Sequence, residues 1–430
     1  MIQPRKVVAY LVVALCVTAI GSANEPAKTG LTASTQDWPW WRGPERNGVA
    51  ATGQNPPLKW SETENVVWKA AIPGRGHSSP IIFGDRIFLL TADQEHFSQL
   101  ALCYRRSTGE LLWKKEVHQG QFNPTGIKPD NKKSTYANST VACDGERIYA
   151  NFMHDSAIYT TALDLNGQQM WQKRITDYVL HQGFAASPTV YKNLVIVSAD
   201  NKGKGAIVAL ERTTGDEVWK IDRPKLPNYT SPIILTVAGR EQLFFFGCKL
   251  VTSLEPLTGK TIWEIDGSTE ECVTSTVTDG NLIFTSGGYP KNHLAAVHAD
   301  GSGKIAWENN SRVYVPSMQQ KDGYLYAILD AGVAMCWKCA TGEEVWKERI
   351  GGTFSSSLVL VDDNLFATDE AGKTTIFKAS PAGFTAVAEN QLGEEAFATP
   401  TIVGGRVYMR VASTVNGSRQ EMLYCLGEKK

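Results

Sequence analysis

Long apolar stretches are scarce in this sequence of 430 residues, and only one occurs, at its start. Val7–Ile20 is largely apolar, follows Arg5 and Lys6, and precedes the small residues of Gly21–Ala23. The run has about 14 residues, fewer than the ~20 that a membrane-spanning helix needs. This order is typical of a secretory signal peptide. We predict cleavage after Ala23 and export to the periplasm or extracellular space, with no transmembrane segment in the mature chain.

A lipid anchor is the alternative fate of this first segment. Cys16 is the residue that would be acylated. Leu15 precedes it, where such a signal normally has a small side chain. The lipoprotein interpretation is therefore disfavoured.

An excess of one charge sign is also missing. The chain has 43 Lys and Arg against 44 Asp and Glu, and loss of Arg5 and Lys6 with the signal leaves 41 against 44, a net charge of −3. Basic residues form nothing longer than pairs such as Lys132 and Lys133. Nucleic-acid binding draws on a concentrated positive field, so the composition gives no support for a nucleic-acid partner.

Motifs for catalysis and metal binding are absent. No two of the eight cysteines are adjacent, and Ala340 follows Cys336 and Cys339 where a haem-attachment site has histidine. No His pair has zinc-ligand spacing, and GRGHSS (74–79) lacks the third glycine of a dinucleotide fingerprint. There is no G-x-S-x-G elbow. We predict no catalytic residue and no metal site.

One phrase recurs along the chain: a turn with Thr-Gly or Gly, then an apolar residue and a Trp. Examples are RSTGELLW (106–113) and RTTGDEVW (212–219). The Trp residues at this position are Trp68, Trp113, Trp171, Trp219, Trp263, Trp307 and Trp346, with Ala388 in an eighth copy. Successive positions are 45, 58, 48, 44, 44, 39 and 42 residues apart, which brackets the ~40–45 residues of a propeller blade. We interpret these Trp side chains as structural, docking each blade on its neighbour.

A second phrase, often beginning with Ser-Pro or Thr-Pro, predicts a hairpin in each copy, as in SPIIFGDRIF (79–88) and TPTIVGGRVY (399–408). With a third strand and the Trp strand, each copy becomes a four-stranded meander. The last copy (397–426) has no Trp strand, whereas the Trp68 strand has no blade before it. Because blades must stack and hide their edges, we predict an all-β, eight-bladed β-propeller over 62–427, closed by pairing of the Trp68 strand with the C-terminal blade.

These motifs resemble the PQQ-like (pyrroloquinoline quinone) repeat family, whose blades carry Ala-x-Asp-x-x-x-Gly-x-x-x-Trp. ALERTTGDEVW (209–219) keeps this spacing, with Glu211 in place of Asp. The resemblance spans residues 62 to 427 and implies the quinoprotein alcohol dehydrogenase-like fold. That family includes quinoproteins that oxidise alcohols or sugars with PQQ and Ca²⁺, and a periplasmic, cofactor-free propeller that assists outer-membrane assembly. The chain resembles the second kind more, because it lacks adjacent cysteines and a haem motif, and its predicted mature length of 407 residues (430 minus 23) is short.

Residues 24–61 form a Trp-rich N-terminal extension between the signal peptide (1–23) and the propeller. The extension contains DWPWWRGPERNG (37–48), which resembles the lead-in of exported PQQ-like repeat proteins. We expect Trp38, Trp40 and Trp41 to pack across the ring. The alternative is that they form a carbohydrate platform.

The segments before the innermost strands converge on one mouth of the central channel, where propeller ligands gather. These segments carry aromatic, cationic and titratable side chains. The candidate ligand contacts are Arg75, His77, Tyr136, His181, Phe184, Tyr229, Tyr314, Phe354 and Phe397. Such a ring fits a peptide strand, a glycan or a flat cofactor. In the competing interpretation the aromatic side chains only plug the channel.

These observations predict an exported, monomeric, non-catalytic propeller that acts as a binding or scaffold protein for a protein segment or a cell-envelope polymer. No cofactor is expected. The alternative is a PQQ-dependent quinoprotein-type oxidoreductase with PQQ and Ca²⁺, and a second alternative is a glycan-binding propeller.

Overall fold

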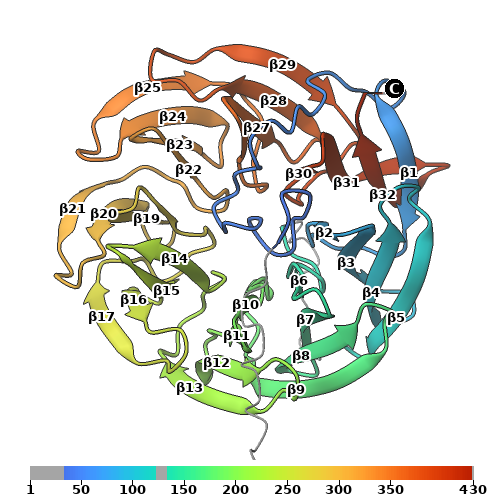
Figure 1. Cartoon of the computed structure of the whole chain (residues 1–430), viewed down its shortest axis with the longest axis horizontal. Coiled ribbons are helices and arrows are strands. Elements are labelled where there is room, and N and C mark those ends of the chain that lie inside the picture. Colours follow the sequence, from blue (N-terminus) through green and yellow to red (C-terminus); the bar gives the residue numbers. More distant parts are fainter. Residues whose placement is uncertain (1–32, 123–132, 429–430) are drawn as a thin grey trace, which may run out of the picture.

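The computed structural model describes residues 33–122 and 133–428, and the predicted signal peptide lies outside these ranges. Within them, strands form eight antiparallel sheets of four strands each. The sheets stand around a central axis as the blades of a propeller (Figure 1). The structure confirms the eight-bladed β-propeller that the repeats predict.

Seven blades are each built from four consecutive strands, which follow one another from the axis outward. The first four blades comprise β2 (Ile81–Phe83), β3 (Arg86–Asp93), β4 (Ser98–Arg105) and β5 (Leu111–Gln119); β6 (Ala142–Cys143), β7 (Arg147–His154), β8 (Ala157–Asp164) and β9 (Gln169–Asp177); β10 (Thr189–Tyr191), β11 (Leu194–Ser198), β12 (Gly205–Glu211) and β13 (Glu217–Arg223); and β14 (Ile233–Val237), β15 (Arg240–Gly247), β16 (Leu250–Leu254) and β17 (Thr261–Asp266). The next three comprise β18 (Val277–Thr278), β19 (Leu282–Gly287), β20 (His293–His298) and β21 (Ile305–Asn309); β22 (Gln319–Lys321), β23 (Tyr324–Ile328), β24 (Val333–Lys338) and β25 (Glu344–Arg349); and β26 (Val359–Val361), β27 (Asn364–Thr368), β28 (Lys373–Lys378) and β29 (Ala386–Gln391).

The eighth blade joins strands from both ends of the chain. From the axis outward it comprises β30 (Thr401–Val403), β31 (Arg406–Val415), β32 (Ser418–Leu426) and β1 (Val66–Ile72). Trp68 of β1 lies opposite Cys425 of β32. In Figure 1 the blue β1 runs beside the red β32. The strand that precedes the first blade thus supplies the outermost strand of the last one.

The outer-strand Trp side chains contact the turn of the following blade. Trp68 Nε1 donates to the carbonyl of Arg106 at 3.0 Å, and Trp113 Nε1 donates to that of Leu165 at 2.9 Å. Gly109, in the turn that Trp68 covers, has φ of +76°, and a Cβ there would lie 2.5 Å from the indole ring. The glycine of the Thr-Gly turn therefore provides both the left-handed backbone and the space for the ring.

A small residue pairs with each Trp in the neighbouring strand, which leaves room for the large ring beside it. These partners are Cys103, Ala162, Ala209, Ser253, Ala296, Cys336 and Cys425. Three of the cysteines are therefore equivalent to the alanines of other blades.

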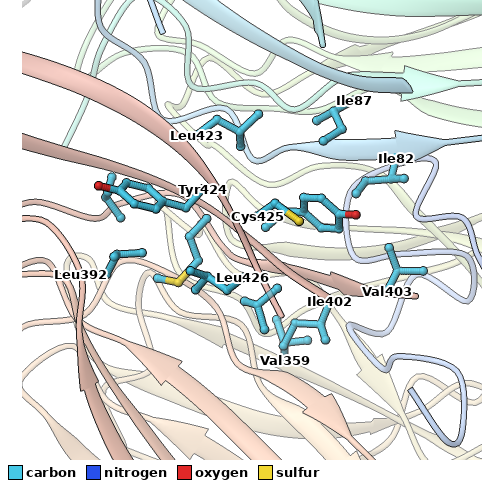
Figure 2. Close-up of a cluster of buried hydrophobic side chains, with 14 of the residues drawn as sticks. Ile82, Ile87, Val359, Leu392, Ile402, Val403, Leu423, Tyr424, Cys425 and Leu426 are labelled. Carbon is cyan, nitrogen blue, oxygen red and sulfur yellow. The ribbon is translucent and has the colours of Figure 1, made fainter. Parts of the chain in front are cut away.

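The hydrophobic core lies in layers between neighbouring blades. Figure 2 shows the layer at the closure, in which Leu423 and Ile402 of the eighth blade share one cluster with Ile82 of the first and Val359 of the seventh. Burial of each such side chain contributes about 1.5–3 kcal/mol. Hydrophobic packing thus holds the closing blade on both of its faces.

The segment before β1 crosses one end of the ring, and it is drawn in blue at the centre of Figure 1. Trp38 pairs with Ile82 of the first blade, and Val49 pairs with Leu360 of the seventh. Gln54 accepts a hydrogen bond from Gly405 of the eighth at 3.3 Å. The segment therefore fastens blades that are far apart in the sequence. Across the described ranges, no helix has the length and apolar character to cross a membrane.

Candidate functional site

Eight hydroxyl residues, one just before the innermost strand of each blade, encircle the axis. They are Ser79, Thr140, Ser187, Ser231, Ser275, Ser317, Ser357 and Thr399. In seven of the eight steps around the ring, the backbone N–H of one residue donates to the hydroxyl of the next blade at 2.8–3.2 Å. In the remaining step the Ser275 hydroxyl accepts from Trp41 Nε1 at 2.8 Å. The Ser-Pro and Thr-Pro phrases mark four of these positions, but the sequence did not predict their hydrogen bonding.

The axial cavity inside this ring is a cup whose floor is the segment that crosses the ring (Figure 1). It has a volume of about 130 Å³ and is lined by residues of all eight blades together with Trp41. The neighbouring Arg42 is 2% exposed and donates to the carbonyls of Leu358 and Met318 at 2.9 and 2.7 Å. Burial lowers the pKa of Arg42 to about 9. Because these bonds fix the segment that crosses the ring, Trp41 forms a firm floor.

Side chains two positions before the hydroxyls line the cup. They are His77, Asn138, Ala185, Tyr229, Val273, Val315, Ser355 and Phe397. In extended chain, residues two apart face the same side, so each of these side chains faces the axis together with its hydroxyl. His77, Tyr229 and Phe397 are the members of the predicted mouth set at this position.

Other members of the predicted set face elsewhere. Phe184 packs against Tyr178, with ring centroids 5.7 Å apart, in the core between the second and third blades. Phe354 is buried between the sixth and seventh blades. Both phenylalanines lie three positions before a hydroxyl, so the extended chain turns them away from the axis. Tyr136 packs against Phe122, with centroids 4.5 Å apart.

His77 and Phe397 line the cup at the junction of the eighth and first blades, whereas the predicted mouth residue Arg75 lines neither the cup nor the neighbouring cavity. The His77 ring stacks on Phe397 with centroids 4.3 Å apart. Burial, together with the nearby guanidinium groups of Arg75 and Arg410, holds the pKa of His77 well below its ordinary value. Burial and Arg419 likewise lower the pKa of Arg75. His77 is therefore neutral at physiological pH and presents a flat aromatic wall.

A second cavity, of about 590 Å³, continues from the cup and spans the second to sixth blades. Its wall contains Glu271, which is only 4% exposed. The Tyr314 hydroxyl donates to Glu271 Oε2 at 3.0 Å, and Glu271 Oε1 lies 3.3 Å from His181 Nδ1. The same His181 nitrogen lies 3.0 Å from the Tyr229 hydroxyl. Three predicted mouth residues, His181, Tyr229 and Tyr314, thus meet around one buried carboxylate.

Sequence reasoning missed Glu271 and Arg312. The Arg312 guanidinium lies 5.1 Å from the centre of the Tyr314 ring, and its Nη1 donates to the carbonyl of Gly288 at 3.1 Å. The connections between blades that carry these residues differ in length and composition from copy to copy. The repeat pattern therefore gives no spacing that predicts which of their side chains meet.

The sequence also matches a known family. A family model described as "Outer membrane protein assembly factor BamB" matches residues 27–178 and 99–348, which together span about three quarters of the chain. The chain belongs to this family. No curated protein matches the sequence.

Solved structures share the fold of this BamB-family chain. BamB from Moraxella catarrhalis matches with a TM-score of 0.58 and 14% identity over 83% of this chain and 96% of that one. A europium-containing methanol dehydrogenase matches with a TM-score of 0.69 and 11% identity over 93% and 99%. A quinohemoprotein alcohol dehydrogenase from Comamonas testosteroni matches with 0.63 and 12% over 94% and 82%. At these identities the likeness shows the fold and does not separate a binding protein from an oxidoreductase.

PQQ with Ca²⁺, the alternative prediction, would need a donor set at the mouth of this BamB-family propeller. Ca²⁺ takes six to eight oxygen ligands. Among the described residues, no three His, Cys, Asp or Glu side chains are grouped to hold a metal ion. Glu271 is the one carboxylate among the described residues that line the two cavities. These side chains do not supply the set of oxygen ligands that Ca²⁺ needs, so we derive no reaction step through the metal and quinone.

Proposed function

We propose that this chain is an exported, non-catalytic propeller that acts as a binding or scaffold protein of the cell envelope. Its mouth holds a segment of a protein or of an envelope polymer. The observation that carries this proposal is the axial cup, to which all eight blades and Trp41 contribute. The family to which the chain belongs, described as an outer-membrane assembly factor, supports the envelope setting.

The construction of the cup favours binding. Its walls are tied by bonds from one blade to the next, such as those that Ser317 and Ser357 make at 3.0 Å. A site that is ordered before the ligand arrives loses little conformational entropy on binding. The lining mixes apolar, aromatic, hydroxyl and charged groups, which is typical of ligand-binding cavities.

Variants that fill the cup test this proposal. Ala185→Trp and Val273→Trp place an indole in the cup, and Val218→Trp, at a position 49% exposed on outer strand β13, is the control. Binding of an unfolded outer-membrane β-barrel polypeptide and of a soluble envelope polysaccharide is measured with the mature chain. We expect about tenfold or weaker binding of at least one probe by the cup variants and unchanged binding by the control.

Two outcomes count against the proposal. One is that neither probe binds, or that binding is equal in the parent and the cup variants. The other is stoichiometric uptake of PQQ with Ca²⁺ and alcohol-dependent dye reduction, which would establish the oxidoreductase instead.

A further inference from the structure

The floor of the cup restricts how a ligand can enter. Trp41 lines the cup, and its indole N–H donates to the Ser275 hydroxyl at 2.8 Å. The segment that carries Trp41 crosses this end of the ring (Figure 1). The buried bonds of Arg42 anchor the same segment behind it. A polymer that threads the ring would therefore meet this segment (Figure 1). A chain end or a single unit can still fill the cup and the side cavity that continues from it.

Three charged residues line the side cavity: Glu271, Arg312 and Lys133. Lys133 is paired with Glu370 at 2.7 Å, so the remaining charges are those of Glu271 and Arg312, which lie on either side of Tyr314. Glu271 Oε2 receives the Tyr314 hydroxyl, and Oε1 lies 3.3 Å from His181 Nδ1. A carboxylate has about four lone-pair sites, so each oxygen can still accept one further hydrogen bond. Arg312, against the ring of the same Tyr314, provides N–H donors only. A cationic ligand drawn to Glu271 meets Arg312, and an anionic ligand drawn to Arg312 meets Glu271. A neutral ligand rich in hydroxyls avoids both repulsions, because each hydroxyl donates and accepts.

Aromatic surface completes this pattern. Tyr289 lines the cavity and is 51% exposed, and Tyr229 lines both cavities. Gly288, beside Tyr289, has no side chain, and a Cβ there would overlap the Tyr314 ring. An exposed aromatic ring beside hydroxyl-binding groups suits a sugar ring, which has an apolar C–H face and a polar edge.

We propose that the cavity of Glu271, Tyr289, Arg312 and Tyr314 binds the end unit of a neutral oligosaccharide. Glu271 accepts from the sugar hydroxyls, Arg312 donates to them, and Tyr289 stacks on the C–H face. This inference rests on the proposed binding function and names the ligand class. Because the side cavity has a volume of about 590 Å³, the affinity should stop rising once the glycan exceeds about three units, since further units lie outside the cavity.

The experiment uses the mature chain and a panel of neutral oligosaccharides of one to six units, built from glucose, xylose, mannose or N-acetylglucosamine. Affinity is measured by calorimetry for the parent, Glu271→Gln and Tyr289→Ala, with Val218→Ala on the outer surface as control. For a bound glycan we expect about tenfold or greater weakening in Glu271→Gln, since bonds to a charged acceptor are strong. Loss of stacking in Tyr289→Ala should weaken binding about three- to tenfold.

Each result bears on the inference. Failure of the whole panel, equal affinity in parent and variants, or an affinity that rises steadily to six units overturns it. The exposed Tyr289→Ala tests the site even if Glu271→Gln perturbs folding. If the unfolded polypeptide binds and these substitutions weaken that binding while no glycan binds, the saccharide inference fails and the proposed function stands. If neither class of probe binds at the cup, both fail.

Discussion

The backbone N–H of Thr399 donates a hydrogen bond of 3.0 Å to the hydroxyl of Ser79, although 320 residues separate them. This bond joins the last blade to the first in the same way that the other inner hydroxyls join their neighbours. At the rim, Trp68 lies opposite Cys425. The ring is therefore closed in two places. Hydrogen bonds to hydroxyl groups join the last blade to the first near the axis, and β1 pairs with β32 at the outer edge.

Removal of one inner hydroxyl should destabilise the propeller. In Ser357→Ala the buried N–H of Ser317 loses its acceptor, and an unsatisfied buried donor costs about 1–3 kcal/mol. The urea midpoint should fall accordingly. Ser418→Ala, in the exposed tip of the β31–β32 hairpin, is the control and should leave the midpoint unchanged. Equal midpoints for the two variants would show that the ring bonds contribute nothing.

A glycine substitution separates ring docking from backbone strain. Gly109 and Gly417 have similar φ angles of +76° and +78°, but only Gly109 faces an indole, since nothing lies within 4 Å of a Cβ at Gly417. We expect Gly417→Ala to cost about 1–2 kcal/mol through its left-handed backbone. Gly109→Ala should cost about 1–3 kcal/mol more, because the methyl group displaces Trp68. Equal losses in the free energy of unfolding, measured by denaturant titration, would show that the Trp68 ring moves aside without an energetic cost.

The fold could be predicted because every blade packs on its neighbour through the same kind of contact. The Thr-Gly turn and the Trp recur together, since the ring of Trp68 needs the space beside Gly109. Even the loss of Trp in one copy, at Ala388, leaves the spacing readable. The signal thus comes from contacts that every blade must make with its neighbour.

The site was harder to predict because the side chains that line it differ from one repeat to the next. His77, Tyr229 and Phe397, two positions before a hydroxyl, line the cup, whereas Phe184 and Phe354, one position further back, face the core. Alternation from the hydroxyl would have separated these groups from sequence alone. No such rule places Glu271 beside His181, because that contact depends on two irregular connections.

The cysteines should be unreactive in the folded protein. All seven in the described ranges are free and buried. Burial raises the pKa of Cys336 and of Cys339 to about 12, and the thiolate is the reactive form. Alkylation at pH 8 should label none of the seven within minutes, and all of them in denaturant. Rapid labelling of the folded protein, or a mass lower by two hydrogen atoms that reductant restores, would contradict this expectation.

The signal peptide predicted over residues 1–23 implies that the chain is exported and cleaved. In a bacterial host, the periplasmic fraction should contain a chain that begins at Asn24. Ala23→Leu should accumulate the uncleaved precursor, because cleavage needs a small residue at this point. Cys16→Ala should have no effect on release. Loss of membrane attachment in Cys16→Ala would instead support the lipoprotein alternative.

The free energy of unfolding should fall in acid because of the titration of His118. This residue is 8% exposed and stacks on His154, with ring centroids 4.6 Å apart. Burial lowers the pKa of His118 from 6.5 to about 3. Between these values the unfolded chain binds a proton that the folded chain does not, so the free energy of unfolding falls as the pH drops, by up to about 1.4 kcal/mol per pH unit.

His118→Phe removes this titration while keeping a ring of similar size. Urea titrations at pH 7, 6 and 5 should therefore show a smaller loss of stability in the variant than in the parent, with the difference widening as the pH falls. Val218→Phe, at an exposed position without a titratable group, is the control and should lose stability in parallel with the parent. Parallel losses in the parent and His118→Phe would mean that His118 takes up its proton in the folded state, and therefore that the stack with His154 opens to water.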